Sequence, residues 1–122
     1  MKKILIVEDE KSLAKILEHK LLSSGFYAEV VFDGENALEK LNENHYDLML
    51  LDLILPKVDG FGVLETMKKK KIKCKVIVLS NLSQTEDIDR VKQLGVIDYL
   101  VKSDIPLIDV VEEVRKRIDT ID

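Results

Sequence analysis

The fold of this chain is decided by the stretch YDLMLLDLILPKVDG, residues 46–60. Its apolar run is followed by a single acid, Asp52, and Pro56 and Gly60 mark the loop that comes next. Short apolar runs bounded by turn signals are typical of strands that are buried on both faces. A carboxylate at the end of such a strand is costly to bury unless it is paired or binds a cation. We therefore expect Asp52 to find its partners elsewhere in the chain.

Length and composition indicate one globular domain in the cytoplasm. The chain has 122 residues, of which 46% are hydrophobic and 34% charged, so we expect a single domain over residues 1–122 without an output domain. A net charge of −4 argues against direct binding to nucleic acid. Cys74 is the only cysteine, which excludes an internal disulfide and suits a reducing compartment. The apolar run 4–7 is too short for a signal peptide, and no stretch approaches the roughly 18 apolar residues of a membrane span.

Strand and helix patterns alternate along the whole chain. Strands are expected at residues 4–7, 27–32, 48–51, 76–79 and 99–101, and helices at about 12–24, 33–41, 61–71, 83–94 and 106–118. We expect Ser12 and Ser83 to cap the first and fourth helices, and Ile16 and Ile108 to lie on the buried stripes of the first and last. Regular alternation predicts a parallel five-stranded sheet with helices on both faces, which is a three-layer α/β/α fold.

Polar residues stand at the carboxyl ends of four of the expected strands. Glu8 and Asp9 follow the first strand, Asp52 the third, Ser80 the fourth and Lys102 the fifth. Parallel strands place these ends on one edge of the sheet, where ligands of such folds bind. Three acids, a hydroxyl and an amine should therefore converge.

This combination suits a metal site that also holds a phosphoryl group. Three neighbouring carboxylates repel one another unless a cation neutralises them, and Mg²⁺ accepts carboxylate, water and phosphate oxygens. Lys102 and Ser80 would be surplus in a plain metal site, but they could pair with and donate to a phosphoryl group. Asp52 would then be the nucleophile.

The sequence resembles the receiver domains of two-component response regulators over its whole length. The features that carry the resemblance are the Glu8-Asp9 pair, Asp52 with the following Leu55-Pro56 and Asp59-Gly60, Ser80, Tyr99 in the fifth strand, and Lys102 at its end. The resemblance implies the flavodoxin-like strand order 2-1-3-4-5. It also implies that a sensor histidine kinase or a histidine phosphotransfer protein donates a phosphoryl group to Asp52.

The resemblance also implies roles for individual residues. Asp9, Asp52 and the backbone carbonyl of Ile54 would ligate Mg²⁺, with Glu8 acting through a metal-bound water. Ser80 would move toward the phosphoryl group and Tyr99 would turn inward behind it. The face built from the expected helix 83–94, the strand 99–101 and the last helix would then change its contacts with a downstream effector, or in a homodimer if one forms.

Three positions depart from the family pattern. Ser103 follows Lys102 where the family usually has a proline after a cis bond, and we expect a trans bond here because a cis bond before a non-proline residue costs about 2.5–4 kcal/mol. Asn81 stands where a small residue is usual. Ile54 and Leu82 occupy positions that tune hydrolysis of the acyl phosphate in the family. Since neither side chain can orient a water by hydrogen bonding, we hypothesise slow dephosphorylation.

Other interpretations stay open at this point. A pseudo-receiver would use the same fold for binding without phosphorylation, and Lys102 could pair with Asp52 in a purely structural role. An aspartate-nucleophile phosphatase is a further alternative, but such enzymes commonly have a second acid two residues after the nucleophile, where this chain has Ile54. We therefore expect a signalling domain that catalyses only its own phosphorylation and dephosphorylation. The lysines at 68–71 are interpreted as the solvated end of a helix.

Overall fold

The structure is a computed structural model and describes residues 1–119. Within these residues five strands alternate with five α-helices. The strands are β1 (Lys3–Val7), β2 (Tyr27–Val31), β3 (Leu48–Leu51), β4 (Lys75–Ser80) and β5 (Asp98–Val101). The helices are α1 (Lys11–Ser23), α2 (Gly34–Glu43), α3 (Gly60–Lys70), α4 (Thr85–Gln93) and α5 (Leu107–Ile118), with a short 3-10 helix η1 (Lys102–Asp104) after β5. The expected end of the domain, residues 120–122, lies outside this range.

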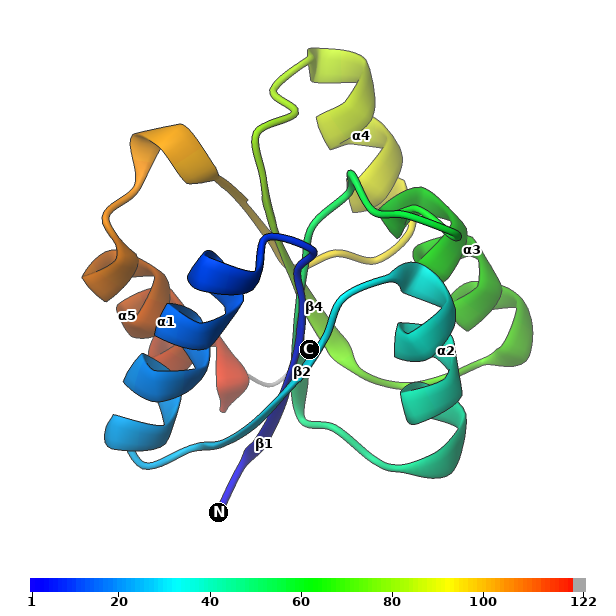
Figure 1. Cartoon of the computed structure of the whole chain (residues 1–122). Helices are drawn as coiled ribbons and strands as arrows, with labels where there is room; N and C mark the ends of the chain where they lie inside the picture. Colours follow the sequence, from blue (N-terminus) through cyan, green and yellow to red (C-terminus); the bar gives the residue numbers. More distant parts are fainter. Residues whose placement is uncertain (120–122) are drawn as a thin grey trace.

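The five strands form one parallel sheet in the order β2-β1-β3-β4-β5, which confirms the predicted topology. Helices α1 and α5 cover one face of the sheet, and α2, α3 and α4 cover the other (Figure 1). The expected three layers are thus present. β1 and β3 are neighbours at the centre, so the acids that follow them start from adjacent points on one edge.

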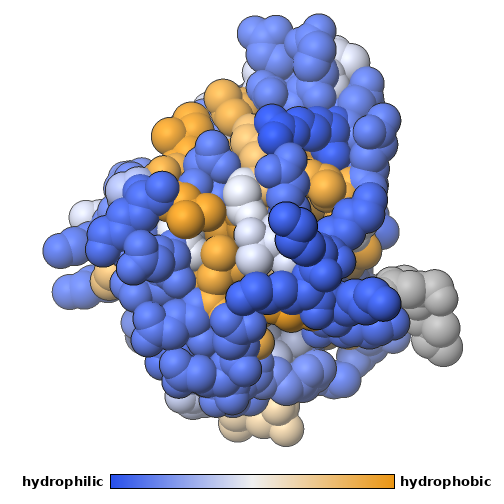
Figure 2. Space-filling model, turned by 90° about the vertical axis from the view of Figure 1, so that its right-hand side faces the viewer, coloured by the Kyte–Doolittle hydropathy of each residue, from blue (hydrophilic) through white to orange (hydrophobic). Residues whose placement is uncertain are grey.

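Each face of the sheet has its own apolar core. Along β1, Leu5 and Val7 point toward α2, α3 and α4, whereas Ile4 and Ile6 point toward α1 and α5. This alternation follows from the period of two in a strand, and apolar helices on both faces explain why β3 is apolar throughout. Figure 2 views the α2–α3–α4 side, where hydrophilic outer surfaces leave apolar atoms visible mainly in the middle of the face. None of the helices within the described range has the length and apolar character of a membrane span.

Two apolar side chains lie outside the cores, contrary to expectation. Ile16 is 45% exposed and Ile108 is 65% exposed. Ala14 on α1 and Val110 on α5 are buried in their place. Ile16 and Ile108 therefore lie at the margin of their apolar stripes, and the buried part of each stripe is centred on other residues.

The helix starts also differ in part from the prediction. Asp33 caps α2, because its side chain accepts a hydrogen bond from the N–H of Asn36 at 2.7 Å. The caps predicted at Ser12 and Ser83 are wrong: α1 and α4 begin after Glu10 and Gln84, and neither side chain makes a cap bond. Both helices are held by packing rather than by a side-chain cap.

The loop after β3 is fixed against the start of α2. A Cβ added to Gly34 would lie 1.9 Å from the carbonyl oxygen of Val58, so only glycine allows this approach. Lys57 has a positive φ of 67° and its ammonium lies 3.8 Å from a carboxylate oxygen of Asp33. The segment that follows Asp52 is therefore held in place by contacts outside the site itself.

Candidate functional site

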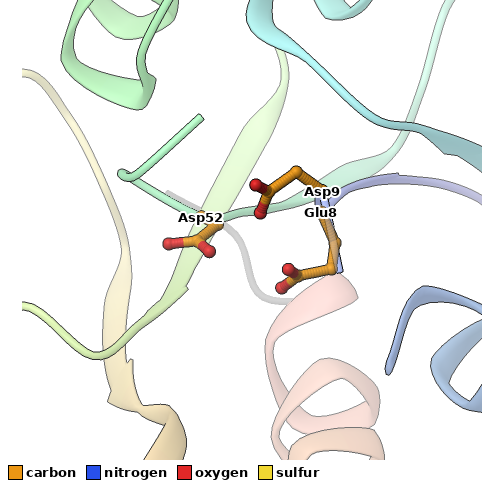
Figure 3. Close-up of side chains that lie close together, drawn as sticks. All are labelled: Glu8, Asp9 and Asp52. Atoms are coloured by element: carbon orange, nitrogen blue, oxygen red, sulfur yellow. The ribbon is translucent and has the colours of Figure 1, made fainter. Parts of the chain in front are cut away.

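Three carboxylates meet at the carboxyl edge of the two central strands. Glu8 and Asp9 follow β1 and Asp52 follows β3, and one oxygen from each lies within 4.8 Å of the others. Figure 3 shows the three side chains directed into the same space from the two strand ends. Glu8 is 2% exposed and Asp52 is 4% exposed, whereas Asp9 lies at the surface. The predicted convergence of these acids is confirmed, and the pocket opens to solvent on the side of Asp9.

Both oxygens of Asp52 are already engaged. Its Oδ1 accepts a hydrogen bond from the backbone N–H of Ile54 at 3.2 Å, and its Oδ2 accepts one from the ammonium of Lys102 at 2.7 Å. These donors fix the orientation of the carboxylate and keep it compatible with burial.

Lys102 bridges the two buried acids. Its Nζ lies 2.7 Å from Oδ2 of Asp52 and 2.7 Å from Oε1 of Glu8. Burial alone would lower the pKa of Lys102, but its hydrogen bonds to Asp52 and Glu8 outweigh burial and raise this pKa above its usual value. Lys102 is therefore charged at neutral pH and supplies one positive charge to a pocket of three acids.

The charged form of Glu8 is disfavoured in the pocket, although the carboxylate accepts two hydrogen bonds. Burial raises the pKa of Glu8 above its usual value, although the hydrogen bonds from Lys102 and from the backbone N–H of Glu10 act in the opposite direction. The hydrogen bonds thus do not fully offset the cost of burying the negative charge of Glu8. A further cation beside it would relieve that cost.

The donor set of the pocket fits a hard divalent cation. It consists of carboxylate oxygens alone, and one ammonium leaves their negative charge only partly neutralised. Mg²⁺ takes oxygen ligands and usually keeps several waters, which suits a pocket that is open beside Asp9. Glu8, Asp9 and Asp52 could hold such an ion.

Ser80 ends β4, Tyr99 is the second residue of β5, and neither makes a described hydrogen bond to Asp52. Ser80 is buried at the end of β4, and its Oγ lies 3.4 Å from the backbone N–H of Leu82. The hydroxyl of Tyr99 donates a hydrogen bond to the carbonyl oxygen of Leu82 at 2.5 Å. Both side chains therefore contact the backbone of the loop between β4 and α4.

Ile54 and Leu82 each follow a site residue by two positions, Asp52 and Ser80 respectively, and both have apolar side chains. Ile54 is 55% exposed and Leu82 is partly buried. Neither side chain carries a hydrogen-bonding group. Neither residue can therefore act as a side-chain base or orient a water by hydrogen bonding.

The loop after β5 contains one contact that sequence reasoning missed. The Lys102–Ser103 bond is trans, as predicted. The backbone N–H of Ser103 donates a hydrogen bond to Oδ1 of Asn81 at 3.0 Å. The signal for this bond was present in the sequence, because a non-proline residue after Lys102 has a free N–H and Asn81 brings an acceptor.

The fold and the site define a flavodoxin-like α/β domain with an acidic pocket bridged by lysine. The sequence matches the response regulator receiver domain family over residues 4–114. It is 35% identical to the alkaline phosphatase synthesis transcriptional regulatory protein PhoP of Bacillus subtilis, across 98% of this chain and 48% of that protein. It is 38% identical to the transcriptional regulatory protein DltR of Streptococcus agalactiae, across 82% of this chain and 45% of that protein. The chain therefore belongs to the receiver domains of two-component response regulators.

Solved structures agree with this assignment. The receiver domain of the Francisella response regulator 1452 has a TM-score of 0.88 and 33% identity, with 97% of each chain covered. The response regulator TrrA of Thermotoga maritima, solved in complex with Mg²⁺ and BeF, has a TM-score of 0.81 and 30% identity, covering 97% of this chain and 99% of that one. The chain spans about half the length of the curated relatives described above.

Proposed function

We propose that Asp52 accepts a phosphoryl group from a phosphohistidine of a sensor histidine kinase or a histidine phosphotransfer protein. The observation that carries this proposal is the bridge from Lys102 to Asp52 and Glu8. An ammonium at this place orients the acceptor carboxylate, and it remains beside the group to which negative charge is added.

The transfer is a displacement at phosphorus. An oxygen of the Asp52 carboxylate forms the new P–O bond, and the P–N bond to the donor imidazole breaks. The electron pair of that bond goes to the imidazole nitrogen. The backbone N–H of Ile54 and the ammonium of Lys102 hold the carboxylate in a fixed orientation. Because the nucleophile is already oriented, less entropy is lost when the reactants reach the transition state.

Glu8, Asp9 and Asp52 would hold Mg²⁺ in this function, with the backbone carbonyl of Ile54 as a further ligand and Glu8 acting through a bound water. The ion would supply charge neutralisation to the acids and to the phosphoryl oxygens. Support comes from the all-oxygen donor set and from the raised pKa of Glu8, which favours a cation beside it.

Phosphorylation would be read out through the loop after β4. Ser80 would donate to the phosphoryl group, and Tyr99 would leave the carbonyl of Leu82 and turn inward. The face formed by α4, β5 and α5 would then change its contacts with an effector, with an attached domain, or with a second copy of the chain. The setting proposed is the cytoplasm, and the unit proposed is a single receiver domain over residues 1–122.

One experiment tests the phosphoacceptor role. The chain is incubated with acetyl phosphate and Mg²⁺ beside Asp52→Asn, and the intact mass of each is measured. The expected result is the gain of one phosphoryl group in the unmodified chain and none in the variant. If neither protein gains mass, with acetyl phosphate or with a phosphorylated histidine donor, the domain is a pseudo-receiver that binds partners without phosphorylation.

A further inference from the structure

A side-chain hydrogen bond links the two loops just beyond the end of the β4–β5 ladder. Ser80 pairs with Val101, and beyond this point β4 continues into the loop toward α4 while β5 continues into η1. The side-chain oxygen of Asn81 nevertheless accepts the backbone N–H of Ser103 at 3.0 Å. A carboxamide carries the same acceptor as a peptide carbonyl. Asn81 thus adds one hydrogen bond between the two loops beyond the end of the ladder.

The contact depends on the residue types at both of its ends. A proline after Lys102 would have no N–H to donate, and a small residue in place of Asn81 would have no carboxamide to accept. This chain has a donor at one position and an acceptor at the other. The bond therefore needs both Asn81 and a residue with a free N–H at position 103.

The bond reaches the site through the backbone of Lys102. The N–H of Ser103 and the carbonyl of Lys102 belong to the same planar peptide unit, so the hydrogen bond that this N–H donates fixes the orientation of the whole unit. Lys102 then extends from that unit to Glu8 and Asp52, at 2.7 Å from each. A lysine side chain has four rotatable bonds, and a fixed origin reduces the positions that its ammonium samples.

A second hydrogen bond holds the same loop from the other side. The hydroxyl of Tyr99 donates to the carbonyl of Leu82, the residue after Asn81. The loop between β4 and α4 is thus attached to the β5 segment at two adjacent residues. The Asn81 contact is the one next to Lys102, because Ser103 directly follows it.

From this geometry we infer that Asn81 is a positioning residue for Lys102. Its carboxamide holds the Lys102–Ser103 peptide by the hydrogen bond to Ser103, and so keeps the ammonium between Glu8 and Asp52 during phosphoryl transfer. The inference rests on the proposed function in one respect, namely that Lys102 assists the transfer to Asp52.

The first test uses the rate of Asp52 phosphorylation by acetyl phosphate at saturating Mg²⁺, measured over a range of acetyl phosphate concentrations. The variants are Asn81→Ala, Ser103→Pro and their combination, with Ser103→Ala as the matched control that keeps the backbone N–H. We expect Asn81→Ala to lower the maximal rate about two- to tenfold while the half-saturating concentration stays unchanged. Ser103→Ala keeps the original rate.

The double variant separates the hydrogen bond from other effects. Ser103→Pro also restricts the backbone of Lys102, so its own rate does not isolate the bond. If the bond carries the effect, Asn81→Ala lowers the rate in the Ser103 chain and has no further effect in the Ser103→Pro background. An equal loss in both backgrounds, or no loss in either, overturns the inference.

A second measurement does not depend on phosphorylation. The order parameter of the Lys102 ammonium group is measured by ¹⁵N relaxation in the unmodified chain, in Asn81→Ala and in Ser103→Ala. We expect a rigid ammonium in the first and third proteins and a more mobile one in Asn81→Ala. If Asp52 takes no phosphoryl group, the proposed function fails, and this measurement still decides whether Asn81 positions Lys102. Equal order in all three proteins contradicts it.

Discussion

The ammonium of Lys102 lies 2.7 Å from Oδ2 of Asp52, and so it holds one oxygen of the proposed acceptor before any donor arrives. The same nitrogen lies 2.7 Å from Glu8, which makes it the only described cation in contact with both buried acids. The charge of this one side chain therefore influences stability as well as chemistry.

Replacement of Lys102 by methionine should destabilise the fold in the absence of Mg²⁺. Lys102→Met leaves two buried carboxylates without their partner, and we expect the free energy of unfolding at neutral pH to fall by about 2–4 kcal/mol. Added Mg²⁺ should restore more stability to this variant than to the original chain, because the ion replaces the lost charge. Urea unfolding with and without Mg²⁺ measures both effects.

The control is Lys40→Met, which removes an exposed ammonium 3.7 Å from Glu29. Its loss should change the free energy of unfolding by less than about 1 kcal/mol. Equal effects of the two substitutions would contradict the role given to Lys102.

Acidification should weaken Mg²⁺ binding. The loss should begin at a higher pH than in a site whose carboxylates have ordinary pKa values. Burial raises the pKa of Glu8, so as the pH falls this carboxyl takes up its proton earlier than an exposed glutamate does. The proton removes negative charge from the pocket, and the affinity for Mg²⁺ decreases. Calorimetric titration with Mg²⁺ at about pH 7.5 and about pH 5.5 measures the change.

Glu8→Gln is the matched variant for this experiment, because its side chain has a similar size and does not titrate. We expect weaker Mg²⁺ binding at neutral pH and a shallower dependence on pH than in the original chain. Identical slopes for both proteins would show that Glu8 is not the titrating group.

The acyl phosphate on Asp52 should be long-lived, provided that it forms as proposed. Ile54 and Leu82 have apolar side chains, which cannot orient an attacking water by hydrogen bonding. Ile54→Asn combined with Leu82→Glu introduces groups that can do so, and the phosphate lifetime should shorten by about tenfold. Intact mass followed over time after removal of the donor gives the lifetime. Ile108→Asn changes an exposed isoleucine elsewhere and should leave it unaltered, and an unchanged lifetime in the double variant would refute slow hydrolysis.

A methyl group at Gly34 should disturb the loop that follows Asp52. In Gly34→Ala the new Cβ would lie 1.9 Å from the carbonyl of Val58, so the loop or the start of α2 must move. We expect a loss of about 1–3 kcal/mol in the free energy of unfolding, together with weaker Mg²⁺ binding. Glu39→Ala on the exposed side of the same helix should change stability by less than about 0.5 kcal/mol. A stable Gly34→Ala protein with unchanged Mg²⁺ affinity would show that the loop is adaptable.

The sequence predicted the parts of the molecule that depend on periodicity. The strand at 48–51 has the predicted bounds, because a short apolar run between an acid and a loop allows few other structures. The meeting of Glu8, Asp9 and Asp52 followed from parallel topology alone.

Features that depend on tertiary packing were not predictable in the same way. Ile16 and Ile108 fit helical stripes in sequence, but the sheet covers only part of each stripe. The double bridge of Lys102 needs the actual distances between two strand ends. The sequence shows the donor at Ser103 and the acceptor at Asn81, but their pairing across 22 residues depends on how the two loops meet in the fold.

The place of each strand in the sheet has a mechanical consequence. Glu8, Asp9 and Asp52 follow β1 and β3, which are paired on both sides, whereas Lys102 follows β5 at the edge of the sheet. Interior strands open only with the whole fold, but an edge strand and its loop can fray at a lower cost. The three acids thus lie on the more rigid side of the pocket, and Lys102 lies on the side that can open locally. Amide hydrogen exchange should accordingly be slowest in β1 and β3 and faster from β5 into η1.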